Sequence, residues 1–302
     1  MKIPKGRILI IGGAEYKDDG RDLPMVDENH ESKPFEILKQ LLPAPKSKSP
    51  IIIIPTASRI PEEMGKSYLE AFGKLDFHNI HVMDIRDRED ANRPDLVEVI
   101  NKAHAVLFTG GSQLRLSTIV GDSFVLNTIK EKYWNDPDFI VAGTSAGSMA
   151  LSKIMIIEGQ TSEAMIKGDL KTSSGLGFID HIIIDTHFVK RGRFGRLTQA
   201  IITNPEYFGV GLGEDTALMI TKGDLVECMG SGMVMIIIDG ASSRYTNIAE
   251  IENQCPISVE NLKVHILTTG DCFKLDEKKF IPRIPIKQHS DHIKMTNGVK
   301  HA

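Results

Sequence analysis

The sequence lacks the features that define several classes of protein. Tryptophan occurs once and cysteine three times among 302 residues. Cys228, Cys255 and Cys272 form no CxxC pair, and an odd count argues against a disulfide framework, so a reducing, cytoplasmic location is expected. The ten histidines form no HExxH motif and no cluster with cysteine. This argues against zinc, and neither a metal nor a cofactor is expected.

A charge excess and a long apolar run are also missing. The formal net charge of -4 gives no reason to expect nucleic-acid binding. No apolar run approaches the ~20 residues that span a bilayer, so no membrane partner is expected. The chain enters a strand-like run at residues 8–11 without a separate apolar segment and cleavage site, which argues against a signal peptide.

Short apolar runs alternate with helical patterns over the first two thirds of the chain. Runs rich in Ile and Val are apolar on both faces, as buried parallel strands are; they cover residues 7–11, 50–54, 79–85, 104–109 and 138–143. Helical patterns between them cover residues 59–75, 94–103 and 112–133. This alternation predicts an α/β fold built on a doubly wound, mostly parallel sheet.

The pattern changes in the C-terminal third. Strand-like runs at 180–186, 207–212, 216–221, 224–229 and 232–238 are separated in several places by tight glycine turns. They predict an antiparallel extension of the same sheet. From about residue 276 the chain is rich in Lys, Pro and His with weak periodicity. We therefore predict one catalytic domain, residues 1–275, and a surface tail, residues 276–302.

Ser145 is the most informative residue of the chain. The apolar run at 138–143 leads into Gly-Thr-Ser-Ala-Gly at 143–147, and small helix-compatible residues follow. A strand, a tight turn and a helix with serine at the tip form the nucleophile elbow of serine hydrolases. Gly143 and Gly147 are needed because this turn leaves no room for a Cβ on either side of the serine.

A serine nucleophile needs a general base, usually a histidine held by a carboxylate. His187 ends the apolar run at 182–184, where catalytic groups of such folds gather, whereas His104 precedes its strand and His181 opens its own. Glu214 and Asp215 both follow the run at 207–212, and the residues alone do not choose between them. The order serine, histidine, carboxylate differs from that of α/β-hydrolases.

Glycine motifs follow two other strands. An oxyanion hole needs two N–H donors; one is expected from Ala146 and another from the segment 109–113, where a strand breaks at two glycines. Gly12 and Gly13 lack the third glycine of a dinucleotide fingerprint, so we expect them to pack near the active-site crevice.

Five motifs in order resemble the S51 family of serine peptidases and, within it, its cyanophycinase branch. They are Ile-Gly-Gly-Ala-Glu at 11–15, Phe-Thr-Gly-Gly-Ser-Gln at 108–113, Gly-Thr-Ser-Ala-Gly at 143–147, Asp-Thr-His-Phe at 185–188 with the arginines that follow, and Gly-Glu-Asp-Thr-Ala at 213–217. The resemblance covers roughly residues 6–275.

The resemblance implies a triad of Ser145, His187 and Glu214, with Gly111 and Ala146 at the oxyanion hole. Residues at positions that line the family's substrate pocket are Gln113, Asp185, Thr186, Arg191, Arg193 and Arg196. The implied fold is an α/β/α sandwich of the class I glutaminase amidotransferase type, and a homodimer is expected. The implied substrate is cyanophycin, a poly-aspartate with arginine amide-linked to each side chain, and the product is β-aspartyl-arginine.

The substrate chemistry fits this set, because arginines can clamp carboxylates and Asp185 can pair with a guanidinium. Two residues depart from the cyanophycinase pattern: Thr186 stands where Gln is usual, and Tyr16 replaces an acidic residue. The alternatives are therefore an aspartyl or isoaspartyl dipeptidase of the same family and a pseudoenzyme that binds peptides.

Overall fold

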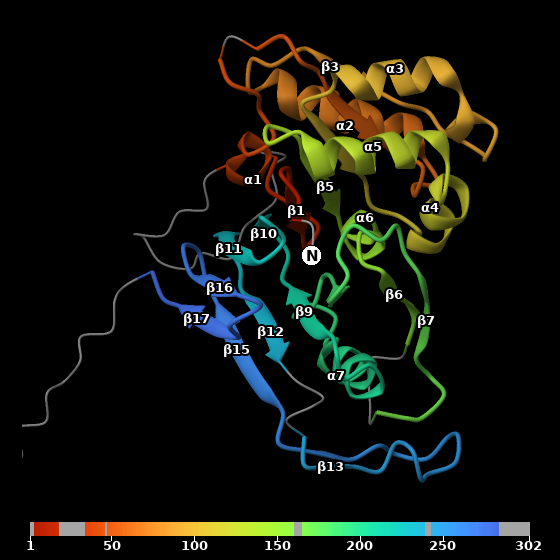
Figure 1. Cartoon of the computed structure of the whole chain (residues 1–302), viewed down its shortest axis with the longest axis vertical. Coiled ribbons are helices and arrows are strands. Elements are labelled where there is room, and N and C mark those ends of the chain that lie inside the picture. The colour runs from red at the N-terminus through yellow and green to blue at the C-terminus, as the bar shows by residue number, and fades with distance from the viewer. Residues whose placement is uncertain (1–2, 18–33, 46, 160–164, 239–242, 284–302) are drawn as a thin grey trace, which may run out of the picture.

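The computed structural model describes residues 3–17, 34–45, 47–159, 165–238 and 243–283. Within these residues the strands form a nine-stranded sheet, a four-stranded sheet and two short two-stranded pairs (Figure 1). Among the helices of these ranges, none is both long and apolar enough to cross a bilayer.

One half of the nine-stranded sheet is parallel, as the sequence predicts. Its strands are β1 (Arg7–Ile11), β2 (Ile51–Ile54), β3 (Ile80–Val82), β4 (Ala105–Phe108) and β5 (Ile140–Thr144). They lie in the order β1, β5, β4, β2, β3 with all neighbours parallel. Strand β3 is shorter than the predicted run because it lies at the edge of the sheet, where it pairs with β2 alone.

The other half of the sheet is antiparallel. It consists of β10 (Thr216–Thr221), β11 (Leu225–Gly230), β16 (Cys272–Lys274) and β17 (Lys279–Ile281), with β10 next to β1. The predicted antiparallel extension is correct for β10 and β11. Strand β17 lies beyond residue 275, where a tail was expected, because a turn at Asp276–Lys278 returns the chain along β16. The remainder of the predicted tail, from residue 284, lies outside the described residues.

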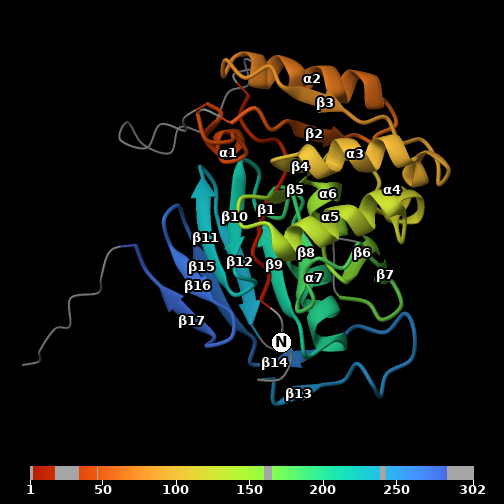
Figure 2. The same ribbon diagram turned by 45° about the horizontal axis from the view of Figure 1, so that its top comes forward.

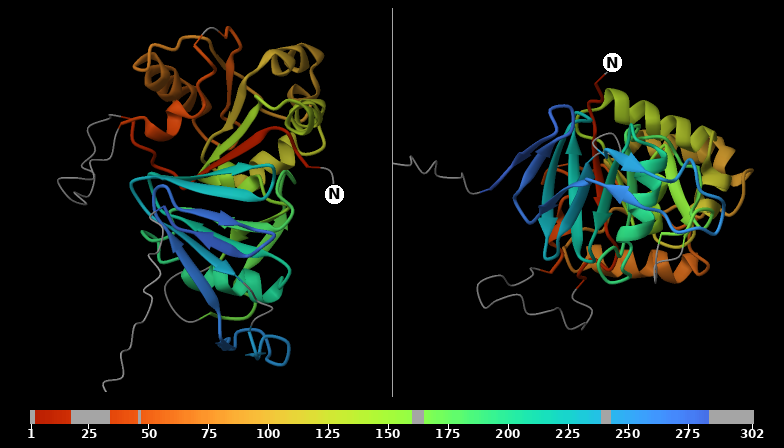
Figure 3. Two further views of the ribbon diagram at one scale, coloured as in Figure 1. Left: turned by 60° about the vertical axis from the view of Figure 1, so that its left-hand side comes forward. Right: turned by 90° about the horizontal axis from the view of Figure 1, so that it is seen from below.

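The other strands predicted as part of that extension form a second sheet instead. It has the order β15 (Lys263–Leu267), β12 (Val234–Ile238), β9 (Phe208–Leu212), β8 (Ile182–Asp185), and β8 is parallel to β9. The chain leaves the first sheet at Gly230, whose φ is +96 and where a Cβ would lie 2.2 Å from the carbonyl oxygen of Asp215. The strands of the C-terminal third therefore gather away from helices α2 to α5 of the first half (Figure 3).

Seven α-helices and one 3-10 turn lie within the described residues. They are α1 (Glu36–Lys39), α2 (Pro61–Gly73), the 3-10 turn (Asp90–Asn92), α3 (Pro94–Lys102), α4 (Gln113–Val120), α5 (Phe124–Asn135), α6 (Ala146–Ala150) and α7 (Phe194–Thr203). The predicted helix at 112–133 is two helices. Asp122 has a φ of 52, and the side chain of Ser123 accepts a hydrogen bond from the Leu126 N–H, so α5 begins anew.

Figure 2 shows the helices around the parallel strands. The short pairs are β6 (Ile154–Glu158) with β7 (Lys171–Ser174) and β13 (Tyr245–Thr246) with β14 (Val259–Glu260).

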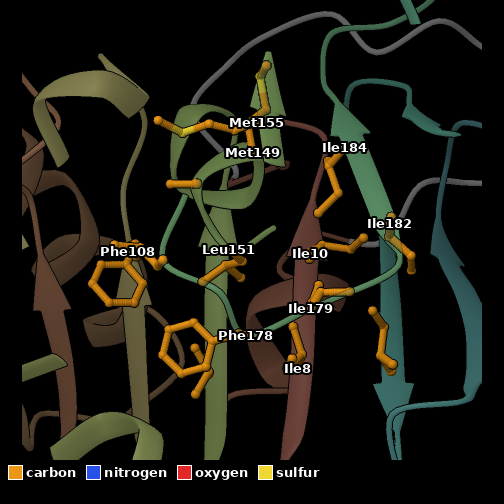
Figure 4. Packing of buried hydrophobic residues seen from close by; sticks show 14 of the residues in the cluster. Ile8, Ile10, Phe108, Met149, Leu151, Met155, Phe178, Ile179, Ile182 and Ile184 are labelled. Atoms are coloured by element: carbon orange, nitrogen blue, oxygen red, sulfur yellow. The ribbon is translucent and has the colours of Figure 1, made fainter. Parts of the chain in front are cut away.

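Both faces of the nine-stranded sheet are buried along β1, β2, β4 and β5. Successive strand residues point to opposite faces, so the apolar run of β1 divides between two clusters. Leu9 and Ile11 pack with residues of α1 and α2. Ile8 and Ile10 belong to the cluster that includes α3 to α7 and the second sheet, with Ile182 among its members (Figure 4). The predicted fold class, an α/β sandwich on a large central sheet, is confirmed.

Candidate active site

Ser145 occupies a sharp turn between β5 and α6. Its φ of 52 and ψ of -118 lie in a region that residues with a Cβ rarely adopt. A Cβ on Gly147 would lie 2.1 Å from the carbonyl oxygen of Phe108, and one on Gly143 would lie 2.5 Å from the backbone of Gly147. The Ser145 N–H donates to the carbonyl of Ile11 at 3.0 Å. The predicted strand, turn and helix are present, and the serine is held in its strained conformation.

His187 and Glu214 lie beside Ser145, at the carboxyl ends of β8 and β9. His187 Nε2 is 2.9 Å from Ser145 Oγ, and His187 Nδ1 is 2.7 Å from Glu214 Oε1. When the imidazole carries its proton on Nδ1, that N–H donates to Glu214 and Nε2 accepts the serine hydroxyl. This arrangement activates a serine nucleophile.

The second carboxylate, Asp215, has other partners. One of its oxygens accepts the Tyr16 N–H at 2.8 Å, and the other accepts the Ser231 hydroxyl at 2.6 Å. Asp215 is buried and has a φ of 46, so consecutive carboxylates point to different neighbours. The structure therefore brings Glu214 to His187 and assigns Asp215 to the loops around it.

Lys190 completes the contacts of Glu214. Its Nζ donates to Glu214 Oε2 at 2.8 Å, although the Lys190 side chain is 70% exposed. Partial burial raises the pKa of Glu214, but hydrogen bonds from Lys190 and His187 outweigh burial and hold that pKa below its usual range. Glu214 is therefore ionised at neutral pH and can stabilise a protonated imidazole.

In the pH profile of kcat/KM, the midpoint of the acid limb is expected to lie below the usual histidine pKa near 6.5. Burial lowers the pKa of His187, the Glu214 hydrogen bond raises it, and the charge of Arg191 lowers it; the net shift is downward. Because the base acts when neutral, a lowered pKa preserves activity to lower pH. Arg191→Gln removes a positive charge and should move the limb to higher pH.

Rates measured from mildly acidic to neutral pH would test this, with Arg283→Gln, beyond β17, as the control for loss of an arginine. An acid limb that stays in place in Arg191→Gln would show that this charge does not act on His187.

Two glycine loops pack against the nucleophile. A Cβ on Gly13, whose φ is +95, would lie 2.6 Å from His187 Nε2, and a Cβ on Gly110 would lie 3.4 Å from that of Ser145. The loop after β1 therefore borders the crevice, as expected from the sequence. The loop at 110–111 lies beside Ser145, and the N–H of Ala146 is at the free N-terminus of α6. The assignment of Gly111 and Ala146 to an oxyanion hole stays a prediction.

Asp185 and two of the predicted pocket arginines bind one another. Asp185 is fully buried and accepts from Arg196 Nε at 2.6 Å and Nη2 at 2.5 Å. Arg193 Nη1 donates to the same carboxylate at 3.0 Å. The two arginines neutralise this buried carboxylate, as burial of a charge requires, and a contact of Asp185 with a substrate guanidinium stays a prediction. Arg196, at 9% exposure, is equally committed to Asp185.

The remaining predicted pocket residues differ in exposure. Gln113 is half-buried and donates from Nε2 to the Ile156 carbonyl at 2.7 Å. Thr186 is buried, and its hydroxyl has no hydrogen-bond partner among the described residues. Arg191 is exposed and Arg193 is partly exposed. Arg191 is therefore the member of this set best placed to meet a substrate carboxylate.

A cleft of about 440 Å³ opens at Ser145. Its lining consists of Ala14, Glu15, Lys17, Ile60, Glu63, Met64, Ser67, Tyr68, Gly110, Thr144 and Ser145. Two lining residues, Lys17 and Tyr68, are not among the site residues predicted from the sequence. Tyr68 has the spacing of a core aromatic on α2. Lys17 follows a motif whose interpretation depended on its two glycines. The position of Lys17, two residues after the Gly-Gly-Ala-Glu motif, is the sequence feature that could have indicated it.

The chain is similar in sequence to known peptidases. The sequence model of Peptidase family S51 matches residues 9–228. A cyanophycinase of Synechococcus elongatus is 32% identical over 90% of this chain and 80% of its own. One of a Nostoc species is 33% identical over 93% of this chain and 89% of its own.

A solved structure shares the fold. It is a peptidase from an acI-B1 Actinobacterium, with a TM-score of 0.63 and 20% identity, and the match covers 91% of this chain and 99% of that one. The family resemblance read from the five sequence motifs is confirmed by the family match.

Proposed function

Because the chain belongs to peptidase family S51, we propose that it is a serine peptidase that hydrolyses cyanophycin to β-aspartyl-arginine. The observation that carries the proposal is the hydrogen-bonded series from Ser145 Oγ through His187 to Glu214. A serine in a strained turn, a base at 2.9 Å and an ionised carboxylate behind it are the parts that nucleophilic acyl transfer needs.

The first half-reaction acylates the enzyme. Ser145 Oγ attacks the aspartyl carbonyl carbon while its proton passes to His187 Nε2. The carbonyl oxygen becomes an oxyanion, for which N–H groups of Gly111 and Ala146 are the proposed donors. The tetrahedral intermediate collapses, the C–N bond breaks, and His187 returns the proton to the leaving amine.

The second half-reaction releases the acyl group. Water attacks the ester carbon and gives a proton to His187, and the ester C–O bond breaks as that proton returns to Ser145 Oγ. Glu214 keeps the imidazole proton on Nδ1 and stabilises the imidazolium formed in each half-reaction. Its contact with Lys190 fixes the carboxylate for both steps.

The charge around the triad supports a substrate that carries carboxylates. The positive charges of Arg191 and Arg193 both lower the pKa of His187. Arg191 is exposed and Arg193 is partly exposed. Carboxylates are the groups that arginine binds best, through paired N–H donors. The two relatives described above are named cyanophycinases. Each unit of cyanophycin has one free carboxylate, that of its arginine, beside a guanidinium. These observations favour cyanophycin over uncharged peptides.

The proposal is tested by incubating the purified full chain with insoluble cyanophycin and identifying soluble products by mass spectrometry. We expect release of β-aspartyl-arginine. Short α-aspartyl and isoaspartyl dipeptides would be assayed in parallel, and their kcat/KM should be at least about tenfold lower than that of a soluble cyanophycin oligomer.

Cleavage of the dipeptides with an intact polymer would replace cyanophycin by short aspartyl peptides as the substrate. Tight peptide binding without any cleavage would identify a pseudoenzyme. A homodimer and a cytoplasmic location stay predictions.

A further inference from the structure

A lysine is held at the nucleophile's cleft by a carboxylate and an aromatic ring. Lys17 Nζ lies 3.2 Å from Glu15 Oε1 and 3.6 Å from the centre of the Tyr68 ring, and its side chain is 14% exposed. The Tyr68 hydroxyl donates to Glu15, and Thr144, the residue before Ser145, donates its hydroxyl to Glu15 Oε2 at 2.8 Å. Glu15 thus links the ammonium group of Lys17 to Thr144, the residue that precedes the nucleophile.

The carboxylate of this cluster remains charged. Burial would raise the pKa of Glu15, but Lys17, Tyr68 and Thr144 outweigh burial and lower that pKa to about 2. Glu15 is only 2% exposed. It therefore acts as a fixed counter-charge that sets where the ammonium group of Lys17 lies.

The position of Lys17 is suited to a ligand. An ammonium group has three N–H donors. Within the part of the chain that the structure describes, its partners are one carboxylate and one ring face, so donor capacity remains on the side of the cleft. A buried ion pair by itself gives a fold little stability. A charged group kept at the cleft of a nucleophile has a clearer use in recognition.

Although the lining carries two carboxylates and one ammonium group, the part of the cleft beside Lys17 favours an anion over a cation. The face of Tyr68, which could have received a substrate guanidinium, is already occupied by Lys17. The other acidic residue of the lining, Glu63, is exposed on α2, so solvent screens its charge. A substrate carboxylate that enters the cleft would meet the ammonium group of Lys17 close to Ser145.

We propose that Lys17 is a specificity-determining residue that binds a carboxylate of the substrate beside Ser145, with Glu15 and Tyr68 as its positioning residues. The inference rests on the proposed function and adds a second cationic position to it. Arg191 and Arg193 act at His187, whereas Lys17 lines the cleft at the nucleophile. A substrate with carboxylates at two places would engage both positions.

The test compares two soluble substrates: a short cyanophycin oligomer and the same oligomer with every carboxylate converted to a primary amide. Lys17→Met should lower kcat/KM for the unmodified oligomer by roughly 10- to 100-fold, mainly through KM, because a charge-assisted hydrogen bond is lost. The amide oligomer should change by less than about threefold. Lys17→Arg should retain most of the preference for the unmodified oligomer.

The ratio of the two rates does not depend on how much enzyme is folded, so partial misfolding cannot imitate the result. Lys66 is an exposed lysine of α2 that pairs with Glu70. Its replacement, Lys66→Met, is the matched control and should leave the ratio unchanged. A neutral phosphonate should label Ser145 at the same rate in Lys17→Met and wild type.

Equal losses on both oligomers would overturn the role of Lys17 and leave the proposed function standing. If wild type labels with the phosphonate but cleaves neither oligomer, the proposed substrate is wrong, and the assignment of Lys17 is wrong with it.

Discussion

Replacing Ser145 with alanine is expected to lower kcat by roughly 10³- to 10⁶-fold, with a much smaller change in KM. The substitution removes the oxygen that forms the acyl bond. It keeps the Cβ, and the Ser145 N–H bond to Ile11 that holds the turn is a backbone contact. The remaining rate would come from substrate binding and oxyanion stabilisation alone.

The measurement is single-turnover hydrolysis of the cyanophycin oligomer, with labelling by a serine-directed phosphonate followed by mass spectrometry. Ser117→Ala is a suitable control, since the Ser117 hydroxyl only donates to the Leu114 carbonyl at 3.2 Å within α4. Labelling should disappear in Ser145→Ala and persist in Ser117→Ala. Near-normal hydrolysis by Ser145→Ala would show that another group is the nucleophile.

The parallel half of the fold could be predicted because its strands are continuous apolar runs. A run such as Ile51–Ile54, buried on both faces, allows few positions other than the centre of a sheet. The second sheet could not be predicted in the same way. The strand Val234–Ile238 is apolar too, but its neighbours depend on the bend at Gly230, and a glycine does not show in which direction a chain bends.

The site divides along a similar line. His187 could be identified because its role follows from its place at a strand end. The choice of Glu214 over Asp215 depends on side-chain direction, which is set here by the Tyr16 N–H and the Ser231 hydroxyl from distant segments. Likewise, the spacing of Arg193 and Arg196 is the same whether they face a substrate or a buried carboxylate.

Replacing Glu214 with glutamine should lower kcat by roughly 10²- to 10⁴-fold, with near-normal folding. The amide has one acceptor oxygen where the carboxylate has two. Lys190 can only donate, so the oxygen should turn toward Lys190 and the NH₂ group toward His187 Nδ1. That contact favours an imidazole with its proton on Nε2, which cannot accept the proton of Ser145. Steady-state kinetics and thermal unfolding of the variant would measure both effects.

Two further variants distinguish a change in the His187 tautomer from a general disturbance of the site's structure. Lys190→Met added to Glu214→Gln frees the amide oxygen to face Nδ1–H, so the double variant should recover part of the lost kcat.

Asp215→Asn should behave differently, because an amide still accepts one of the two hydrogen bonds from Tyr16 and Ser231. We expect it to lose roughly 1–3 kcal/mol of unfolding free energy and less than about tenfold in kcat. If Asp215→Asn lost activity as severely as Glu214→Gln does, the two carboxylates would act together on His187, and the division of roles between them would be wrong.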